Sequence, residues 1–442
     1  MPSAMVNELP ATQTSTSVIG KYRWTICALL FAATTINYID RQILALLKPT
    51  LDAQLHWSNE DFGNVNAYFQ LAYAAGLLLF GAFIDRVGTK IGYAASIAAW
   101  SVAALGHALV SSVGGFITAR VALGLGEGGN FPSAIKAVAL WFPKRERAMA
   151  TAMFNAGTNV GAVVAPATIP FIAAAWGWQS CFVIAGIAGF LWLFLWGPLY
   201  NTPDKIKRMT PGELAHIRSD LDEKSTESGK VAWFKLLKYR QAWSFFVAKF
   251  LTDPVWWFFL TWLPDFFKKT RHMDIKNSAK YLVTIYLIVT VLSIAGGWFT
   301  GYLNRRGMTV TRARKTGMLI FAVLVVPILL VKGVGDWPAV LLIGLACSAH
   351  QAWSANLFTT VSDMFPKRAV ASVIGIGGMA GAMGGFLIQK YAGRVLDHFQ
   401  ATTGSVDAGY ALLFTICASA YLVAFVINHL LAPKYEQVQM AD

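Results

Sequence analysis

Four charged residues lie inside apolar segments of the sequence, where their types and spacing could bind an anion and move protons. Asp40 and Arg41 fall within the apolar run at residues 22–47, and Arg120 and Glu127 fall within the run at 113–138. Arg120 and Glu127 are seven positions apart. That is close to two α-helical turns of about 3.6 residues each, so the two side chains share one helix face. A charge at the centre of a lipid-spanning helix costs about 2.5–3.5 kcal/mol on insertion scales, so such side chains usually face an internal cavity and pair. Two carboxylates and two guanidiniums among apolar helices therefore predict a site that handles protons and binds anions.

The segments that must position these charges have the composition of an integral membrane protein. Hydrophobic residues make up 56% of the chain and charged residues 14%, whereas soluble domains carry about 25% charged residues. Apolar runs of about 20 residues, long enough to cross a bilayer as helices, recur along most of the chain. We expect an all-α integral membrane fold with twelve transmembrane helices, at residues 22–47, 61–84, 91–110, 113–138, 148–174, 179–199, 241–267, 279–303, 316–332, 338–362, 369–393 and 407–431.

The net charge of +14 is distributed in a way that argues against a nucleic-acid partner. Lysine and arginine gather in the short connectors that follow the second, fourth, eighth and tenth predicted spans. These connectors fall on one side of the membrane, which the positive-inside rule assigns to the cytoplasm together with both termini. The basic run at 268–276 opposes this pattern locally. The lipid bilayer is therefore the expected large-scale partner.

The predicted spans divide into two groups of six around a polar segment. We expect a cytoplasmic tail at 1–21, a six-helix bundle at 22–199, a central cytoplasmic loop at 200–240, a second six-helix bundle at 241–431 and a tail at 432–442. The first twenty residues contain no apolar stretch of the kind found in cleaved signal peptides. Thr210-Pro211-Gly212-Glu213 has the form of a capping box with proline at the first helical position, which predicts a short helix over 211–223. Ser58 and Asp61 similarly mark the start of the second span.

Two connectors recur at matching positions of the two groups. Asp85-Arg86-Val-Gly88 follows the second span, and Asn304-Arg305-Arg-Gly307 follows the eighth. The fourth and tenth spans are followed by Phe-Pro-Lys-Arg at 142–145 and at 365–368. Matching connectors indicate an internal duplication, as in transporters built from parallel six-helix repeats.

These motifs carry a resemblance to a known family. The GxxxDRxGxK pattern at 81–90 resembles the cytoplasmic signature of the major facilitator superfamily, and with the twelve spans and the repeated connectors the resemblance covers nearly the whole chain. The stretches at 37–41 and 141–147, with the Arg120–Glu127 spacing, are similar to the anion:cation symporter family, whose members carry organic acids. The stretch at 249–259 is most similar to its bacterial hexuronate transporters. The resemblance implies a monomer in the bacterial inner membrane that is not an enzyme and needs no cofactor beyond the coupling proton.

The resemblance also implies roles for particular residues. It implies that the hydroxyl groups of Tyr38 and Tyr73 line a substrate cavity. It makes the connector after the second span and its repeat a cytoplasmic latch that favours the outward-open state, although Ile91 and Asn304 depart from the family pattern. The residues assigned to gating are Asp85, Arg86, Gly88, Asn304 and Arg305.

We therefore expect a proton-coupled symporter for a sugar acid, most specifically a hexuronate such as galacturonate or glucuronate. Arg41 is the expected anchor for the substrate carboxylate, because a planar guanidinium can grip both oxygens and stays charged. Asp40 and Glu127 are the expected proton carriers, since burial and a neighbouring arginine act in opposite directions on the pKa of a carboxyl group. Arg120 shares a face with Glu127 and biases its protonation.

Several interpretations stay open at the level of sequence. Asn155 and Thr158 could donate hydrogen bonds to a polyhydroxylated substrate or to a neighbouring helix. The substrate could be an aldonate of the galactonate type or another organic anion, and the chain could be a membrane sensor that does not transport. The glycine pattern at 124–129 matches a dinucleotide fingerprint, but inside an apolar segment it indicates close helix packing. Metal-ligand spacing and a nucleophile–base pair are not visible in the sequence, so an enzyme is not expected.

Overall fold

The computed structural model describes residues 20–219 and 233–440, and every regular element among them is helical. The predicted tail at 1–21 and the last part of the predicted short helix fall largely outside the described residues. The helices are α1 (Tyr22–Leu55), α2 (Asn59–Val87), α3 (Thr89–His107), α4 (Val113–Glu127), α5 (Asn130–Trp141), α6 (Lys144–Trp176), α7 (Trp178–Leu199), η1 (Pro203–Lys205), α8 (Pro211–Arg218), α9 (Trp233–Leu236), α10 (Arg240–Lys269), α11 (Ile275–Arg305), α12 (Val310–Val325), η2 (Val326–Gly333), α13 (Asp336–Met364), α14 (Lys367–Thr403) and α15 (Asp407–Leu431).

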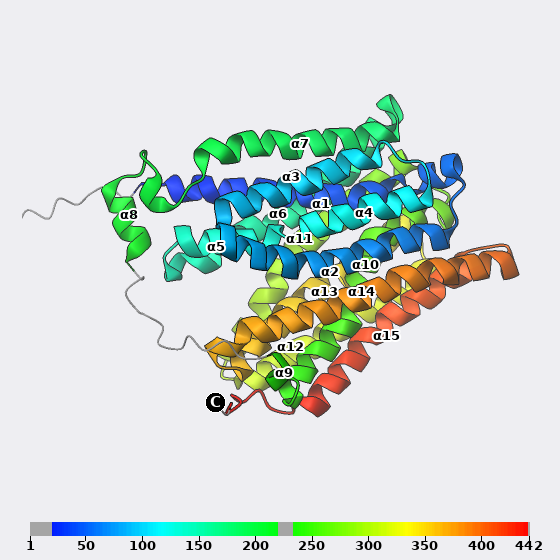
Figure 1. Cartoon of the computed structure of the whole chain (residues 1–442). Helices are drawn as coiled ribbons and strands as arrows, with labels where there is room; N and C mark the ends of the chain where they lie inside the picture. The colour runs from blue at the N-terminus through cyan, green and yellow to red at the C-terminus, as the bar shows by residue number, and fades with distance from the viewer. Residues whose placement is uncertain (1–19, 220–232, 441–442) are drawn as a thin grey trace, which may run out of the picture.

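The long helices form two groups, α1–α7 (the first half) and α10–α15 (the second half). Figure 1 shows most of the first half above α12–α15, whereas α11 overlaps the first half in this view. Helix α2 packs along α14, and α1 packs against α10. At the end that carries α8 and the C terminus the ribbons of the two halves diverge, whereas at the opposite end they lie together (Figure 1). Residues on α1 and α2 are therefore positioned by contacts between the halves as well as by contacts within the first half.

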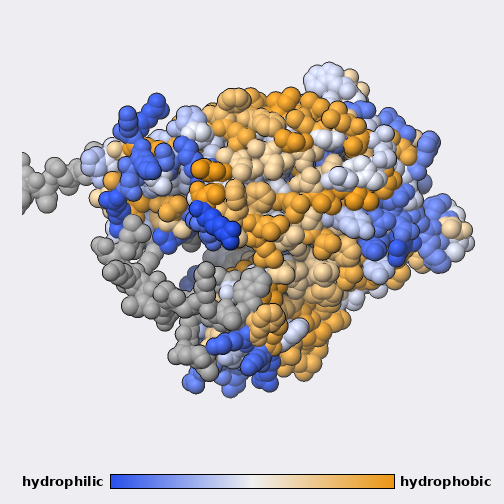
Figure 2. Space-filling model, in the orientation of Figure 1, coloured by the Kyte–Doolittle hydropathy of each residue, from blue (hydrophilic) through white to orange (hydrophobic). Residues whose placement is uncertain are grey.

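Seven of the described helical segments are long and apolar enough to cross a membrane, those of α2, α6, α7, α11, α12 with η2, α14 and α15. The other five predicted spans fall on helices with buried charges (α1 and α10), on a helix rich in polar residues (α13), or on shorter helices (α3, and α4 with α5). Hydrophobic side chains cover the middle of the molecular face in Figure 2, and hydrophilic ones gather toward both ends of the helices. The chain is thus an all-helical membrane protein.

The predicted span at 113–138 is wrong in one respect, because it consists of two helices, α4 and α5, that meet at Gly128-Gly129. The backbone N–H of Gly129 bonds to the carbonyl of Gly126 at 3.3 Å, which tightens the turn between them. A Cβ atom at Gly124 would lie 2.7 Å from the carbonyl oxygen of Phe69 on α2, and one at Gly128 would collide with the backbone of α2. The glycines therefore bring α4 against α2, which confirms the packing interpretation of this run.

Other boundaries differ because helices continue beyond the apolar runs. Helix α1 extends from the predicted end at 47 to Leu55, and α14 from 393 to Thr403. The predicted ninth span changes from α-helix to 3₁₀-helix at Val326. The capping box at Ser58 is confirmed, since its hydroxyl accepts from the Asp61 N–H at 3.0 Å and the Asp61 carboxylate accepts from the Ser58 N–H at 3.0 Å.

The repeated connectors have repeated backbone conformations. Gly88, between α2 and α3, has φ +84°, and Gly307, between α11 and α12, has φ +93°. This left-handed region favours glycine because it has no Cβ atom. Phe142 and Phe365 both end a helix in extended backbone, and the proline after each caps the next helix. Sequence echo and shared geometry together favour an internal duplication.

Candidate substrate and proton site

The structure brings the four charges of the sequence analysis together between α1 and α4. Asp40, Arg120 and Glu127 are buried, with 2%, 1% and 0% of their surface exposed. Arg41 Nε donates to Glu127 Oε2 at 2.6 Å, and the two side chains are 7% and 0% exposed. Glu127 is thus paired with the arginine of α1, although Arg120 shares its helix face.

Several buried polar atoms beside this ion pair have no hydrogen-bond partner among the described residues. They are Nε and Nη2 of Arg120, both carboxylate oxygens of Asp40, Oε1 of Glu127 and both amide atoms of Asn37. A buried polar group left unsatisfied costs about 1–3 kcal/mol, and more if it is charged. Free guanidinium donors attract an anion, and free carboxylate oxygens attract protons, so the arrangement can bind both.

Aromatic rings surround the Arg41 guanidinium. Its Cζ atom lies 4.3 Å from the ring centroid of Tyr73, 5.2 Å from that of Tyr38 and 5.5 Å from that of Trp257. Phe69 lies within reach of both arginines, at 5.7 Å from Arg41 and 5.4 Å from Arg120. Such rings attract a cation by about 0.5–2 kcal/mol and keep water away from it. Tyr38 and Tyr73 therefore adjoin the predicted anchor.

A cavity of about 20 Å³ lies beside these charges. This is about the space of one water molecule. Its lining comes from both halves: Tyr38, Arg41, Gln42, Asn66, Phe69, Gln70 and Arg120 from the first, and Trp257, Leu260 and Thr261 from the second. A larger cavity of about 590 Å³ lies beside the end of α12 and the C-terminal segment, but none of the predicted site residues lines it.

Gln70 and the wall supplied by α10 are two parts of the cavity that were not predicted from the sequence. Gln70 is 2% exposed, lines the cavity, and its Oε1 atom has no hydrogen-bond partner among the described residues. Its position three residues before Tyr73, on the same face of a helix, was the available signal. Gln389 on α14 holds the opposite wall in place, because its Nε2 atom donates to Thr261 Oγ1 at 2.8 Å and to the Trp257 carbonyl at 3.1 Å.

Asn155 and Thr158 on α6 do not line the cavity; Asn155 is exposed and Thr158 half-buried. The neighbouring glycines serve packing, since a Cβ at Gly157 would lie 2.6 Å from the Phe31 carbonyl oxygen and one at Gly161 would lie 2.7 Å from that of Thr35. These contacts press α6 against α1. Substrate contact by Asn155 and Thr158 remains a prediction.

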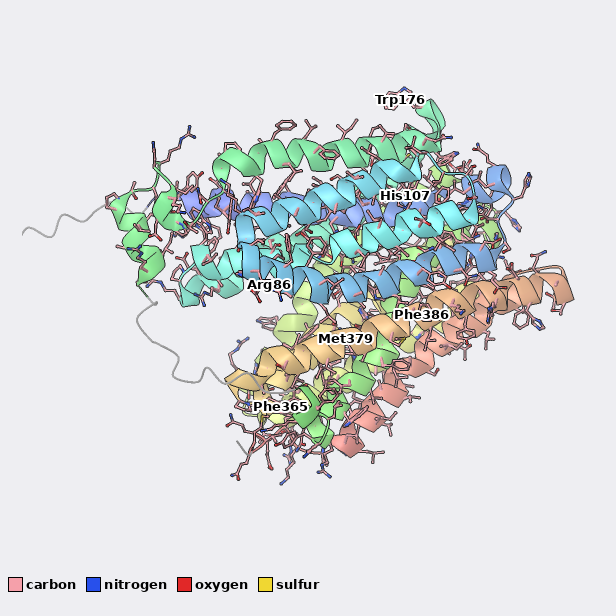
Figure 3. All side chains as sticks on the ribbon, viewed as in Figure 1. Arg86, His107, Trp176, Phe365, Met379 and Phe386 are labelled. Atoms are coloured by element: carbon pink, nitrogen blue, oxygen red, sulfur yellow. The ribbon has the colours of Figure 1, made fainter. Side chains whose placement is uncertain are left out.

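The residues predicted to gate lie at helix ends on the surface. Asp85 pairs with Lys136 of α5 at 2.8 Å, within its own half, and Arg86 is exposed near the end of α2 (Figure 3). Asn304 and Arg305 are also exposed, and Arg305 lies over the Trp298 ring at 5.9 Å. Among the described residues, the ion pair of Asp85 thus lies within the first half, and the gating role of this connector remains a prediction.

Comparisons with known proteins bear on the family and the fold of the chain. A family model described as Major Facilitator Superfamily matches residues 30–388. The chain is 30% identical over 400 residues to a hexuronate transporter of Escherichia coli strain K12, with 90% of each chain covered. It is 24% identical over 389 residues to a D-galactonate transporter of another Escherichia coli strain, with 86% of this chain and 90% of that one covered. A solved bacterial homologue of the human lysosomal transporter Spinster, in an inward-facing and occupied conformation, is similar in fold, with a TM-score of 0.73, 17% identity, and 94% of this chain and 98% of that chain covered.

Proposed function

The chain belongs to the Major Facilitator Superfamily, a family of membrane transporters rather than enzymes, and on that premise we propose that it is a proton-coupled symporter that imports a hexuronate such as galacturonate or glucuronate. The proposed architecture is twelve transmembrane helices in two six-helix repeats, with both termini in the cytoplasm of a bacterial cell and the protein in its inner membrane. The 30% identity to a hexuronate transporter supports a sugar acid as substrate.

The observation that carries the proposal is the unequal pairing of the two buried arginines. Arg41 is neutralised by Glu127 at 2.6 Å, whereas Nε and Nη2 of Arg120 have no partner among the described residues. With both carboxylates ionised the four charges sum to zero, and each proton taken up by Asp40 or Glu127 leaves one positive charge uncompensated. A substrate carboxylate supplies that missing charge.

In the proposed cycle, a proton on Glu127 releases Arg41 to bind the substrate carboxylate in bidentate geometry. The guanidinium of Arg120 attracts the anion to the same cavity. Asp40, whose two oxygens have no hydrogen-bond partner among the described residues, is the second proposed proton carrier. Substrate binding and proton binding thus support each other because each removes an uncompensated charge left by the other.

The hydroxyl and C–H groups of a sugar acid can contact the uncharged residues of the cavity. Gln70 Oε1 is a free acceptor for a sugar hydroxyl, and the Trp257 ring offers an apolar face for C–H groups. The hydroxyls of Tyr38 and Tyr73 are further proposed contacts. A cavity of about 20 Å³ is too small for a hexuronate, so the halves must move apart around the site for binding, as alternating access requires.

An aldonate is the second candidate substrate, because the chain is also similar to a D-galactonate transporter along most of its length. The deciding experiment is uptake of labelled galacturonate and galactonate into proteoliposomes of the purified protein, with an acidic exterior as the driving force. We expect concentrative galacturonate uptake that a protonophore abolishes and that replacement of sodium by potassium leaves unchanged. Uptake of galactonate alone would transfer the proposal to an aldonate. Failure of every sugar acid to enter or exchange would favour a sensor that does not transport.

A further inference from the structure

A second cluster of buried charges joins the two halves at the far end of the helices. Lys48 on α1 and Asp265 on α10 are each 0% exposed, and Lys48 Nζ lies 3.1 Å from Asp265 Oδ1. Lys48 also donates to Asp52 at 2.5 Å and to Asn59 Oδ1 at 2.9 Å. Lys269 on α10 donates to the same Asn59 oxygen at 2.7 Å and lies 3.5 Å from Asp52. We call these five residues the inter-half cluster.

Two neighbouring contacts extend the cluster. The Tyr410 hydroxyl donates to Asp265 Oδ2 at 2.5 Å. The Asp397 carboxylate on α14 accepts from the backbone N–H groups of Asn59 at 3.1 Å and Glu60 at 2.7 Å. A carboxylate of the second half thus satisfies free donors at the N-terminus of α2 in the first half, where the helix dipole favours negative charge.

This end of the molecule is opposite the end that carries α8. Helix α1 begins beside α8, where Arg23 Nη1 lies 3.3 Å from Glu213 Oε1, and it continues for 34 residues to Leu55. Figure 1 shows the turn between α1 and α2 and the end of α14 together at that far end. Within the described residues 20–219 and 233–440, the hydrogen bonds and ion pairs between the halves fall into two groups. One group is the inter-half cluster, and the other is the adjoining contacts of Asp397 and Arg394 with α2.

Each charged residue of the cluster has a second partner on its own helix. Lys48 and Asp52 are four residues apart on α1, and Asp265 and Lys269 are four residues apart on α10 at 3.2 Å. If the halves separate, each helix keeps one such pair, so no charge is left alone. A buried charge that loses its only partner costs about 3–5 kcal/mol. The cluster therefore has two satisfied arrangements, one shared network and two separate pairs.

We propose that the inter-half cluster is a gate that closes the cavity on the membrane side away from the basic connectors, and that it opens by exchanging ion pairs between halves for pairs within each half. This inference rests on the proposed alternating-access cycle. It assigns to Lys48, Asp52, Asn59, Asp265 and Lys269 the control of the outward opening, whereas the connector with Asp85 lies at the other end. The exchange keeps the open and closed states close in free energy, which a reversible gate requires.

The test measures opening without substrate, so that it is independent of which acid is transported. Spin labels at Gln54→Cys and Ala401→Cys, both on exposed positions at this end, report the distance between halves in the full chain. The four native cysteines are buried and stay unlabelled. Asp265→Asn removes the charge that pairs with Lys48 across the halves and with Lys269 on its own helix. We expect it to raise the ratio of long-distance to short-distance populations at least tenfold.

Asp397→Asn provides a second, half-buried position in case Asp265→Asn does not fold, and it should shift the same ratio in the same direction by a smaller factor. Asp336→Asn is the matched control, because its ion pair with Arg271 at 3.5 Å lies within the second half. We expect no shift for that variant. The gate is overturned if folded Asp397→Asn leaves the distances unchanged and Asp265→Asn, where it folds, does the same. An equal shift in the control Asp336→Asn would also overturn it. If the distances shift as expected but the wild-type protein takes up no galacturonate, the gate stands and the proposed substrate is wrong.

Discussion

Replacing Glu127 by glutamine tests the proposed coupling most directly, because it keeps the shape of the side chain and fixes it in a neutral state. The wild-type carboxylate and the Arg41 guanidinium are 2.6 Å apart and 0% and 7% exposed. Two unit charges about 4 Å apart attract by about 4 kcal/mol at an effective dielectric constant of 20. A substrate anion must compete with this attraction for Arg41 unless Glu127 is protonated.

The variant should therefore bind galacturonate more tightly than the wild type at alkaline pH. If one tenth to one half of the attraction is recovered, the gain is about twofold to thirtyfold in Kd, since 1.4 kcal/mol is a factor of ten. Substrate binding to the wild type takes up a proton on Glu127. By linkage, the affinity for substrate is therefore highest at low pH and falls as the pH rises. In Glu127→Gln that proton is absent, so the slope of log Kd against pH should fall by about one. Titration calorimetry of the purified protein between pH 6 and pH 8.5 measures both quantities.

Transport assays with the same variant complete the test. Proton-driven accumulation should disappear, whereas exchange of labelled for unlabelled substrate should survive, because exchange need not return an empty carrier. Asp253→Asn is the control, since it neutralises a half-buried carboxylate, paired with Lys249 at 2.6 Å in the second half. It should cost stability without changing the pH slope. Retained accumulation by Glu127→Gln would remove this residue from the proton path and leave Asp40, and joint loss of binding and stability would reduce Glu127 to a support for Arg41.

Three further outcomes are expected. Arg41→Ala should abolish sugar-acid binding and Arg41→Lys should restore it poorly, because an ammonium group cannot reproduce bidentate geometry; near-normal binding by the alanine variant would make Arg120 the anchor. Gln70→Leu should weaken galacturonate binding about tenfold but leave binding of a simple carboxylate such as acetate unchanged, whereas equal losses for both would indicate a packing role. If two protons accompany one monoanion, an inside-negative potential of 100 mV should assist uptake by about 2.3 kcal/mol, and an uptake rate independent of potential would exclude that stoichiometry.

The sequence by itself determined the membrane class, the family and the four central charges. Long apolar runs must be helical in lipid, because every backbone N–H and C=O group needs a partner there. Hydropathy therefore predicts helices in these runs, although their bounds differ in places, as at 113–138. The charges at 40, 41, 120 and 127 were recognisable because each interrupts such a run. The glycines at 88 and 307 were recognisable because the same residue recurs at the same turn.

Only the tertiary structure decided which charges pair. Helical periodicity places Arg120 and Glu127 on one face, but the 2.6 Å partner of Glu127 comes from α1, because the packing of helices sets the distance between them. Gln70 and Thr261 gain their place beside the cavity only when α2 and α10 meet. Lys48 follows the last residue of the predicted first span, where a lysine reads as an ordinary interfacial charge. Its burial against Asp265, 217 positions later, exists only because α1 continues to Leu55 and ends against α10.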